Sequence, residues 1–170
     1  MKSLNYLILT VLLLIPTTCF NGEIKSSKDL NSVWLEKVDK AYELAHKTAL
    51  LLAIAEVESS WVMDTVNHKE NAIGLLQIRS IMVDEVNRVS TNGRYKHDDC
   101  YNPIKSIRIF LAIQNYYNHE LDIKKACMVW NAGSLSKSSE YKVRDYENKV
   151  RKKYQYYYEK MVMAYVNDIV

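Results

Sequence analysis

Apolar residues recur along most of this chain at the three- and four-residue spacing that places side chains on one face of an α-helix. Leu51, Ile54 and Ala55 follow that spacing, and the pattern continues to Glu58. A second helical stretch begins near Ser32, and no strong helix breaker separates it from the first. The pattern therefore predicts helix up to Glu58 and leaves open whether the two stretches form one continuous helix.

Four further helices are predicted downstream, over Ser80–Val89, Ile104–Tyr117, Ile123–Trp130 and Tyr141–Tyr165. Asn102 and Pro103 are a favourable N-cap and first residue for the second of these, and Asp122 is a favourable cap for the third. Polar loops are expected between them, at Asp64–Asn71, Ser90–Asp99 and Ser134–Ser139. Because 4 Gly and 2 Pro leave little turn chemistry for an all-β fold, we expect an all-α or mostly α protein.

The N-terminal residues have the features of an export signal. Lys2 supplies a positive start, and Leu7–Ile15 is an apolar run that is short for a membrane span. We expect residues 1–20 to direct export to the periplasm or cell envelope, residues 21–31 to be a flexible lead-in, and residues 32–170 to form one compact domain. A lipid anchor at Cys19 is an alternative, although the residues before it match the usual lipoprotein signal poorly.

The net charge limits the expected binding partners, and the cysteine content limits the expected disulfides and metal sites. A net charge of +3 argues against a nucleic-acid-binding protein and permits weak attraction to an anionic envelope polymer. Cys100 and Cys127 are compatible with a disulfide in an oxidising compartment and equally with two unrelated buried thiols. The cysteines lack metal-ligand spacing and the histidines are scattered, so we expect no metal and no cofactor. A monomer is the default expectation.

The predicted first helix ends in two glutamates that cannot share a site. Glu58 continues the apolar face, whereas Glu56 lies roughly 200° around the helix from it. A carboxyl on a core-facing stripe is costly unless it is protonated or paired. A carboxyl that stays protonated near neutral pH is a general acid, so Glu58 is the candidate for chemistry. The alternative is a helix-end glutamate that reaches water or an arginine.

Several motifs now combine into a pattern. The segments are AIAEVES at Ala53–Ser59, GLLQI at Gly74–Ile78, WNAG at Trp130–Gly133 and RDYENKV at Arg144–Val150. Their order and spacing resemble those of SLT-type lytic transglycosylases, and the resemblance extends from about Lys47 to Val150. It implies a compact, mostly helical, lysozyme-like fold with a groove for the glycan strands of peptidoglycan.

The resemblance also implies roles for individual residues. Glu58 matches the catalytic glutamate, and Ser59 matches the serine beside it that shapes the site. Gln77 matches a glutamine that contacts substrate, and Asn131 matches an asparagine near the catalytic acid. Tyr146 matches a tyrosine that lines the groove. We expect these residues to surround the substrate, with Glu58 as the catalytic group.

The chain also departs from the family pattern. Trp130 stands where tyrosine is usual, so a hydroxyl is lost while a surface for binding a sugar ring is kept, although a core position is the alternative for this residue. Lys142 stands where the last motif usually has glutamate, and His68 and Asn71 replace a serine and a glycine. These changes affect expected substrate contacts and leave the acid in place.

The reaction implied by the resemblance needs a single carboxyl. Glu58 protonates the glycosidic oxygen and, once ionised, takes a proton from the C6 hydroxyl of the same sugar, which closes a 1,6-anhydro ring. A hydrolytic muramidase of the same fold is an alternative, and it requires a second acid such as Asp64 or Glu70 to hold a water. We expect those two residues to be solvated loop charges. A second alternative is a wall-binding module of a secretion or surface assembly.

Overall fold

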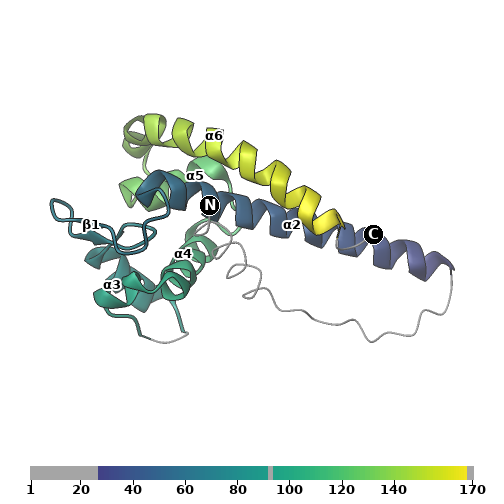
Figure 1. Ribbon diagram of the computed structural model, residues 1–170, viewed down its shortest axis with the longest axis horizontal. Coiled ribbons are helices and arrows are strands. Elements are labelled where there is room, and N and C mark those ends of the chain that lie inside the picture. Colours follow the sequence, from purple (N-terminus) through teal and green to yellow (C-terminus); the bar gives the residue numbers. More distant parts are fainter. Residues whose placement is uncertain (1–26, 92–93, 168–170) are drawn as a thin grey trace.

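The computed structural model describes residues 27–91 and 94–167, and Figure 1 shows their arrangement. The expected export signal and Cys19 lie outside these residues. Helices dominate the described chain, and the only sheet in that part has three very short strands. The predicted fold class, mostly α-helical, is therefore confirmed. Within the described ranges, no helix is both long enough and apolar enough to cross a membrane.

Helix α2 runs without interruption over Ser27–Ser59, so the two predicted stretches are one helix. It begins before the expected start near Ser32 and includes part of the expected lead-in. From Ala49 to Ala55 every residue is buried, which means that the helix passes through the core and is covered on all sides. The apolar face predicted from Leu51, Ile54 and Ala55 is therefore only part of a fully covered segment.

Helix α6, Lys137–Asn167, packs along α2 (Figure 1). It begins before the predicted Tyr141 and includes part of the expected linker. Its buried positions include Val143, Val150 and Tyr157, which are spaced so that they repeat on one helix face. Tyr154 and Tyr157 of α6 form hydrogen bonds with side chains of α2 and so help to join the two long helices.

The segment after α2 forms a small antiparallel sheet of β1 (Val66–Asn67), β2 (Ala72–Ile73) and β3 (Ile78–Arg79), in that order. Part of this segment was predicted as a plain loop. Gly74 follows β2 with a φ of +77°, and a Cβ at this position would lie 2.0 Å from the backbone oxygen of Cys100. Only glycine permits this close approach of the two backbones.

Three helical elements follow the sheet: α3 (Ser80–Val89), η1 (His97–Tyr101) and α4 (Pro103–Tyr117). The α3 bounds agree with the prediction, whereas η1 occupies the end of an expected loop. Asn102 caps α4 by accepting a hydrogen bond from the backbone N–H of Lys105, and Pro103 is its first residue, as predicted. Figure 1 shows α3 and the sheet at the end of the molecule where α2 finishes.

The predicted helix Ile123–Trp130 is α-helical only as far as Cys127. Helix α5 covers Ile123–Cys127, and the chain continues through one wider π-helical turn, η2, over Met128–Ala132. Asp122 caps α5 as expected, and Gly133 ends the turn in the left-handed conformation with a φ of +65°. The wider turn contains Trp130 and Asn131, both of which were predicted as site residues.

The two cysteines of the core are separate free thiols. Cys100 lies in η1 and Cys127 lies in α5, and both are fully buried. Burial raises the pKa of each thiol to about 12, so both remain protonated at neutral pH. Of the two sequence alternatives for this pair, the structure has the unpaired thiols.

Candidate active site

Glu58 lies in the last turn of α2 and opens onto a cavity of about 230 Å³. The walls of this cavity come from α2, the small sheet, η2 and α6, which converge from distant parts of the sequence. Polar side chains dominate the lining. The lining residues are Val57, Glu58, Asn67, Glu70, Ala72, Gln77, Arg79, Trp130, Asn131, Tyr146 and Lys149.

The carboxyl of Glu58 is held by Tyr146, whose hydroxyl donates a hydrogen bond of 2.6 Å to Oε1. Burial raises the pKa of Glu58 to about 7, and this effect outweighs the hydrogen bond from Tyr146 and the charge of Arg79, which both lower the pKa. The pKa of the Tyr146 hydroxyl is raised well above its ordinary value, chiefly by burial, so this group remains a donor. Glu58 is therefore a carboxyl that can be protonated near neutral pH.

Glu56 has a different environment, as the helix geometry predicts. Its carboxylate accepts hydrogen bonds from Lys153 Nζ at 2.5 Å and from the Tyr157 hydroxyl at 2.7 Å. Both partners belong to α6, so Glu56 joins the two long helices. It does not line the cavity around Glu58. The prediction that the two glutamates occupy different sites is confirmed.

Gln77 lies beside the cavity in a strained backbone conformation. Its φ is +47°, a region that few residues other than glycine adopt. The side-chain Nε2 donates to the backbone carbonyls of Thr65 and Gly74, at 3.1 and 2.9 Å. Because both amide hydrogens are used in this way, the amide oxygen is the group left to contact a ligand.

Trp130 and Asn131 lie on the wall of the cavity contributed by η2, and they differ in burial. Trp130 is only 5% exposed, its Nε1 donates to the Leu76 carbonyl at 3.2 Å, and its ring packs edge-on against Phe110. Most of the indole thus belongs to the core, which leaves little surface for a sugar ring. Asn131 is exposed, and its backbone carbonyl accepts a hydrogen bond of 3.3 Å from Arg79.

Ser59 is the predicted site residue that does not line the cavity. Its side chain is buried, and its hydroxyl donates to the Ala55 carbonyl one turn earlier in α2, at 3.2 Å. This local hydrogen bond is a common arrangement for serine in a helix. We interpret Ser59 as a residue that holds the helix end carrying Glu58, and not as one that contacts a ligand directly.

Sequence reasoning missed part of the lining: Arg79, Lys149 and Asn67. Lys149 is three residues after Tyr146 on a helix, and this spacing predicts that the two side chains lie on the same face. Arg79 directly follows the GLLQI motif, but nothing in the sequence indicates its proximity to Asn131.

The two loop acids named as candidates for a second carboxylate, Asp64 and Glu70, differ in position. Glu70 is exposed but lines the cavity, whereas Asp64 does not line it.

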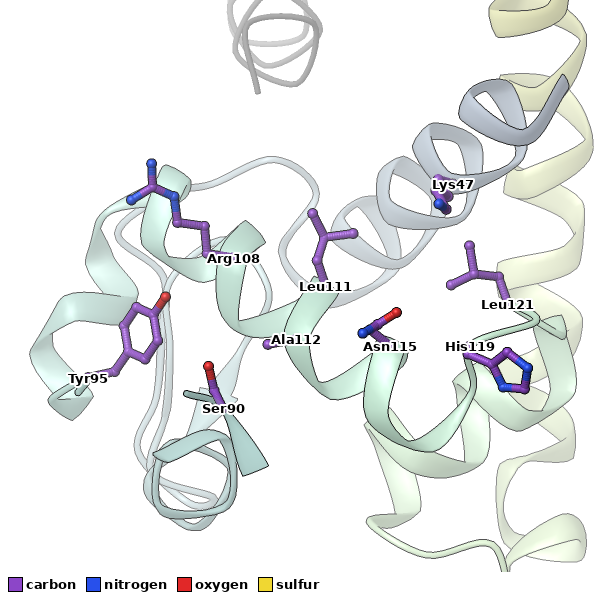
Figure 2. A pocket seen from close by; sticks show the side chains of 9 residues that line it. All are labelled: Lys47, Ser90, Tyr95, Arg108, Leu111, Ala112, Asn115, His119 and Leu121. Atoms are coloured by element: carbon purple, nitrogen blue, oxygen red, sulfur yellow. The ribbon is translucent and has the colours of Figure 1, made fainter. Parts of the chain in front are cut away.

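A larger cavity, of about 650 Å³, lies elsewhere in the molecule. Figure 2 shows its lining, which includes Lys47 of α2 and Arg108, Leu111 and Asn115 of α4. Glu58 is not among its lining residues, and none of the described residues that line it is an Asp or a Glu. Its size alone therefore does not make it the candidate active site.

Across the described part of the chain, no group of three or more His, Cys, Asp or Glu residues could hold a metal ion.

One of three comparisons with known proteins, the comparison with protein families, agrees with the motif pattern. Searches among curated proteins and among solved structures found no match. The family model of the transglycosylase SLT domain matches residues 37–154, which includes all of the cavity described above. The matched segment covers most of the chain and extends beyond the motifs at both ends. The chain therefore belongs to the transglycosylase SLT domain family.

Proposed function

We propose that the protein is a lytic transglycosylase that cleaves the β-1,4 bond between N-acetylmuramic acid and N-acetylglucosamine in peptidoglycan, with a 1,6-anhydro-muramic product. Family membership indicates a transglycosylase type of activity on peptidoglycan. The observation that carries the finer proposal is the carboxyl of Glu58, which lines a polar cavity, accepts a hydrogen bond from Tyr146 and has a pKa of about 7.

In this mechanism one carboxyl acts twice. Protonated Glu58 donates its proton to the glycosidic oxygen, and the bond between that oxygen and C1 of the muramic residue breaks. The ionised carboxylate then takes the proton of the C6 hydroxyl while O6 bonds to C1, so the ring closes and Glu58 regains its proton. No water is consumed. A pKa near neutrality suits a group that is acid in one step and base in the next.

The surrounding residues support the ionised state and hold the sugar. Tyr146 donates to the carboxylate that exists between the two steps. The amide oxygen of Gln77 and the exposed Asn131 are the groups that we assign to contacts with the substrate. Trp130 serves mainly to shape the cavity wall, because nearly all of its ring is buried.

Glu70 favours one alternative function. A muramidase needs a second carboxylate to activate water or to form a covalent intermediate. Glu70 lines the same cavity as Glu58, so it is the residue that would have this role, whereas Asp64 is not part of the lining. The anhydro-forming reaction needs no second carboxylate. The two reactions are distinguished by their products, which have either a 1,6-anhydro end or a hydrated reducing end.

The test is mass spectrometry of the fragments that the full-length protein releases from purified peptidoglycan. We expect fragments one water lighter than hydrolysed ones, and we expect Glu58→Gln to reduce their release by at least about 10³-fold because general acid catalysis is lost. Glu70→Gln is the matched control and should leave the anhydro products in place.

Other products would change the assignment. Hydrated reducing ends that disappear in Glu70→Gln would identify a muramidase. Release that persists in Glu58→Gln would contradict the role of the acid. Binding without any release would favour the wall-binding module.

Cleavage of peptidoglycan takes place outside the cytoplasmic membrane, so the proposed activity agrees with the export, to the periplasm or envelope, that we propose from residues 1–20.

A further inference from the structure

Two cations line the cavity around Glu58 without forming a close ion pair with any described residue. They are Arg79 and Lys149. The guanidinium of Arg79 makes one hydrogen bond, to the Asn131 carbonyl at 3.3 Å, although it carries five N–H donors. By contrast Lys153, which is one turn beyond Lys149 on α6, is paired with Glu56.

The two cations belong to different walls of the cavity. Arg79 ends β3 and is partly buried, and Lys149 lies on the face of α6 that also carries Tyr146. Among the residues that the structure describes, the other charged members of the lining are Glu70 and Glu58. When Glu58 is protonated, as the first step requires, the two cations outnumber the single remaining carboxylate. The cavity is then net positive and attracts an anionic group.

The substrate class offers such a group. The sugar rings of a peptidoglycan strand are neutral, and its anionic groups are carboxylates. A carboxylate is present on the lactyl group of muramic acid where the peptide stem has been removed, and others are present on the stem itself. Arg and Lys are the side chains that bind carboxylates, and the Arg guanidinium can do so through two parallel hydrogen bonds.

We propose that Arg79 and Lys149 form a carboxylate-binding subsite beside Glu58, which selects strands carrying lactyl or stem-peptide carboxylates over neutral glycan. This inference rests on the proposed function, because it concerns the substrate of the same cavity. It adds a specificity that neither the family motifs nor the role of Glu58 requires.

The test measures binding separately from cleavage. The full-length Glu58→Gln protein is titrated with three probes: stem-free strands with free lactyl carboxylates, the same strands after conversion of those carboxylates to neutral methylamides, and strands that keep their stems. We expect Arg79→Gln and Lys149→Gln, each made in this background, to weaken binding to carboxylate-bearing strands by roughly three- to tenfold. Binding to the neutralised strands should be equal for all of these proteins.

Two further variants serve as controls. Lys152→Gln removes an exposed positive charge from the same helix without changing the cavity, so it should bind all three probes like the parent protein. Arg79→Lys keeps the charge at position 79, and we expect it to retain part of the preference for carboxylates. Circular dichroism spectra that match the parent protein establish that each variant is folded.

The probes distinguish the outcomes. A loss on stem-free strands assigns the lactyl carboxylate as the ligand, and a loss confined to stem-bearing strands assigns the peptide. An equal loss on neutralised strands, or no loss on any strand, would overturn the subsite. Anhydro products from the unmutated protein without carboxylate selection would refute only this inference. Carboxylate selection without product release would refute only the proposed lytic activity.

Discussion

In the proposed mechanism the carboxyl of Glu58 must release a proton easily and also recover one. Its pKa of about 7 results from opposing effects: burial raises it, while the Tyr146 hydrogen bond and the charge of Arg79 lower it. The nearby charge of Glu70 raises it further. The residues that surround the acid therefore adjust its proton affinity, and changes in them should move the pH dependence of cleavage.

Tyr146→Phe removes the hydroxyl that stabilises the ionised form of Glu58. The pKa of Glu58 should then rise, so the form that can donate a proton persists to higher pH. We expect the high-pH limb of a plot of kcat/KM against pH to move to higher pH, together with a lower maximal rate. Tyr141→Phe is the control, because Tyr141 is 80% exposed on the same helix and should leave the profile unchanged. An unshifted profile in Tyr146→Phe would contradict this role.

Among the secondary-structure elements, α2 carries a carboxylate that joins two helices and, only two positions away, the carboxyl to which we assign the chemistry. Glu56 joins α2 to α6 through Lys153 and Tyr157, whereas Glu58 opens onto the cavity. The same isosteric substitution should therefore lower stability with little effect on cleavage at Glu56, and should remove cleavage at Glu58.

Glu56→Gln weakens the connection between the two long helices. We expect the free energy of unfolding to fall by about 1–2 kcal/mol, because a charge-assisted hydrogen bond and a partly exposed ion pair are lost. The rate of glycan cleavage should change little. Urea unfolding and the product assay together check this prediction. A large loss of activity with unchanged stability would show that Glu56 belongs to the chemistry.

The turn after β2 is another element that depends on one residue. In Gly74→Ala the new Cβ would meet the backbone oxygen of Cys100 at 2.0 Å, so η1 or the turn must move. We expect a loss of roughly 3 kcal/mol in the free energy of unfolding. Gly133→Ala has a similar positive φ but no atom within 4 Å of the new Cβ, so it should cost only about 1 kcal/mol. Equal losses in denaturant unfolding would argue against the close backbone contact.

For the whole molecule, the buried acid makes stability depend on pH. The pKa of Glu58 is about 7 in the folded protein and near 4.5 when the chain is unfolded. Between these values the folded state binds more protons than the unfolded state, so stability is fully present below pH 4.5 and falls as the pH rises to about 7. The protein therefore loses some stability above pH 4.5 in keeping buried the carboxyl that the proposed mechanism uses.

Glu58→Gln removes this dependence. We expect the variant to be more stable than the unmutated protein above pH 7, by an amount on the order of 3 kcal/mol, and the difference to shrink as the pH falls toward 4.5. Guanidinium unfolding of both proteins across this range measures the difference. A constant difference at every pH would mean that the carboxyl has the same pKa in the folded and unfolded states.

The sequence by itself determined the features that depend on near neighbours. Asn102 and Asp122 cap their helices through backbone groups three residues away, and Gly133 ends a turn because it tolerates a left-handed conformation. The separation of Glu56 from Glu58 also follows from helix geometry alone. These features involve hydrogen bonds and rotations within a turn or two, so local residue types are sufficient to predict them.

Only the tertiary structure decided which distant groups meet. Tyr146 reaches Glu58 across 88 positions of sequence, and Arg79 reaches the carbonyl of Asn131 across 52. Tertiary packing also buries the indole ring of Trp130 in the core. Such contacts depend on how α2, the sheet, η2 and α6 pack against one another. No local sequence pattern determines that packing. The motifs indicate which residues have a role, whereas the cavity and the pKa of its acid result from burial that exists only in the folded chain.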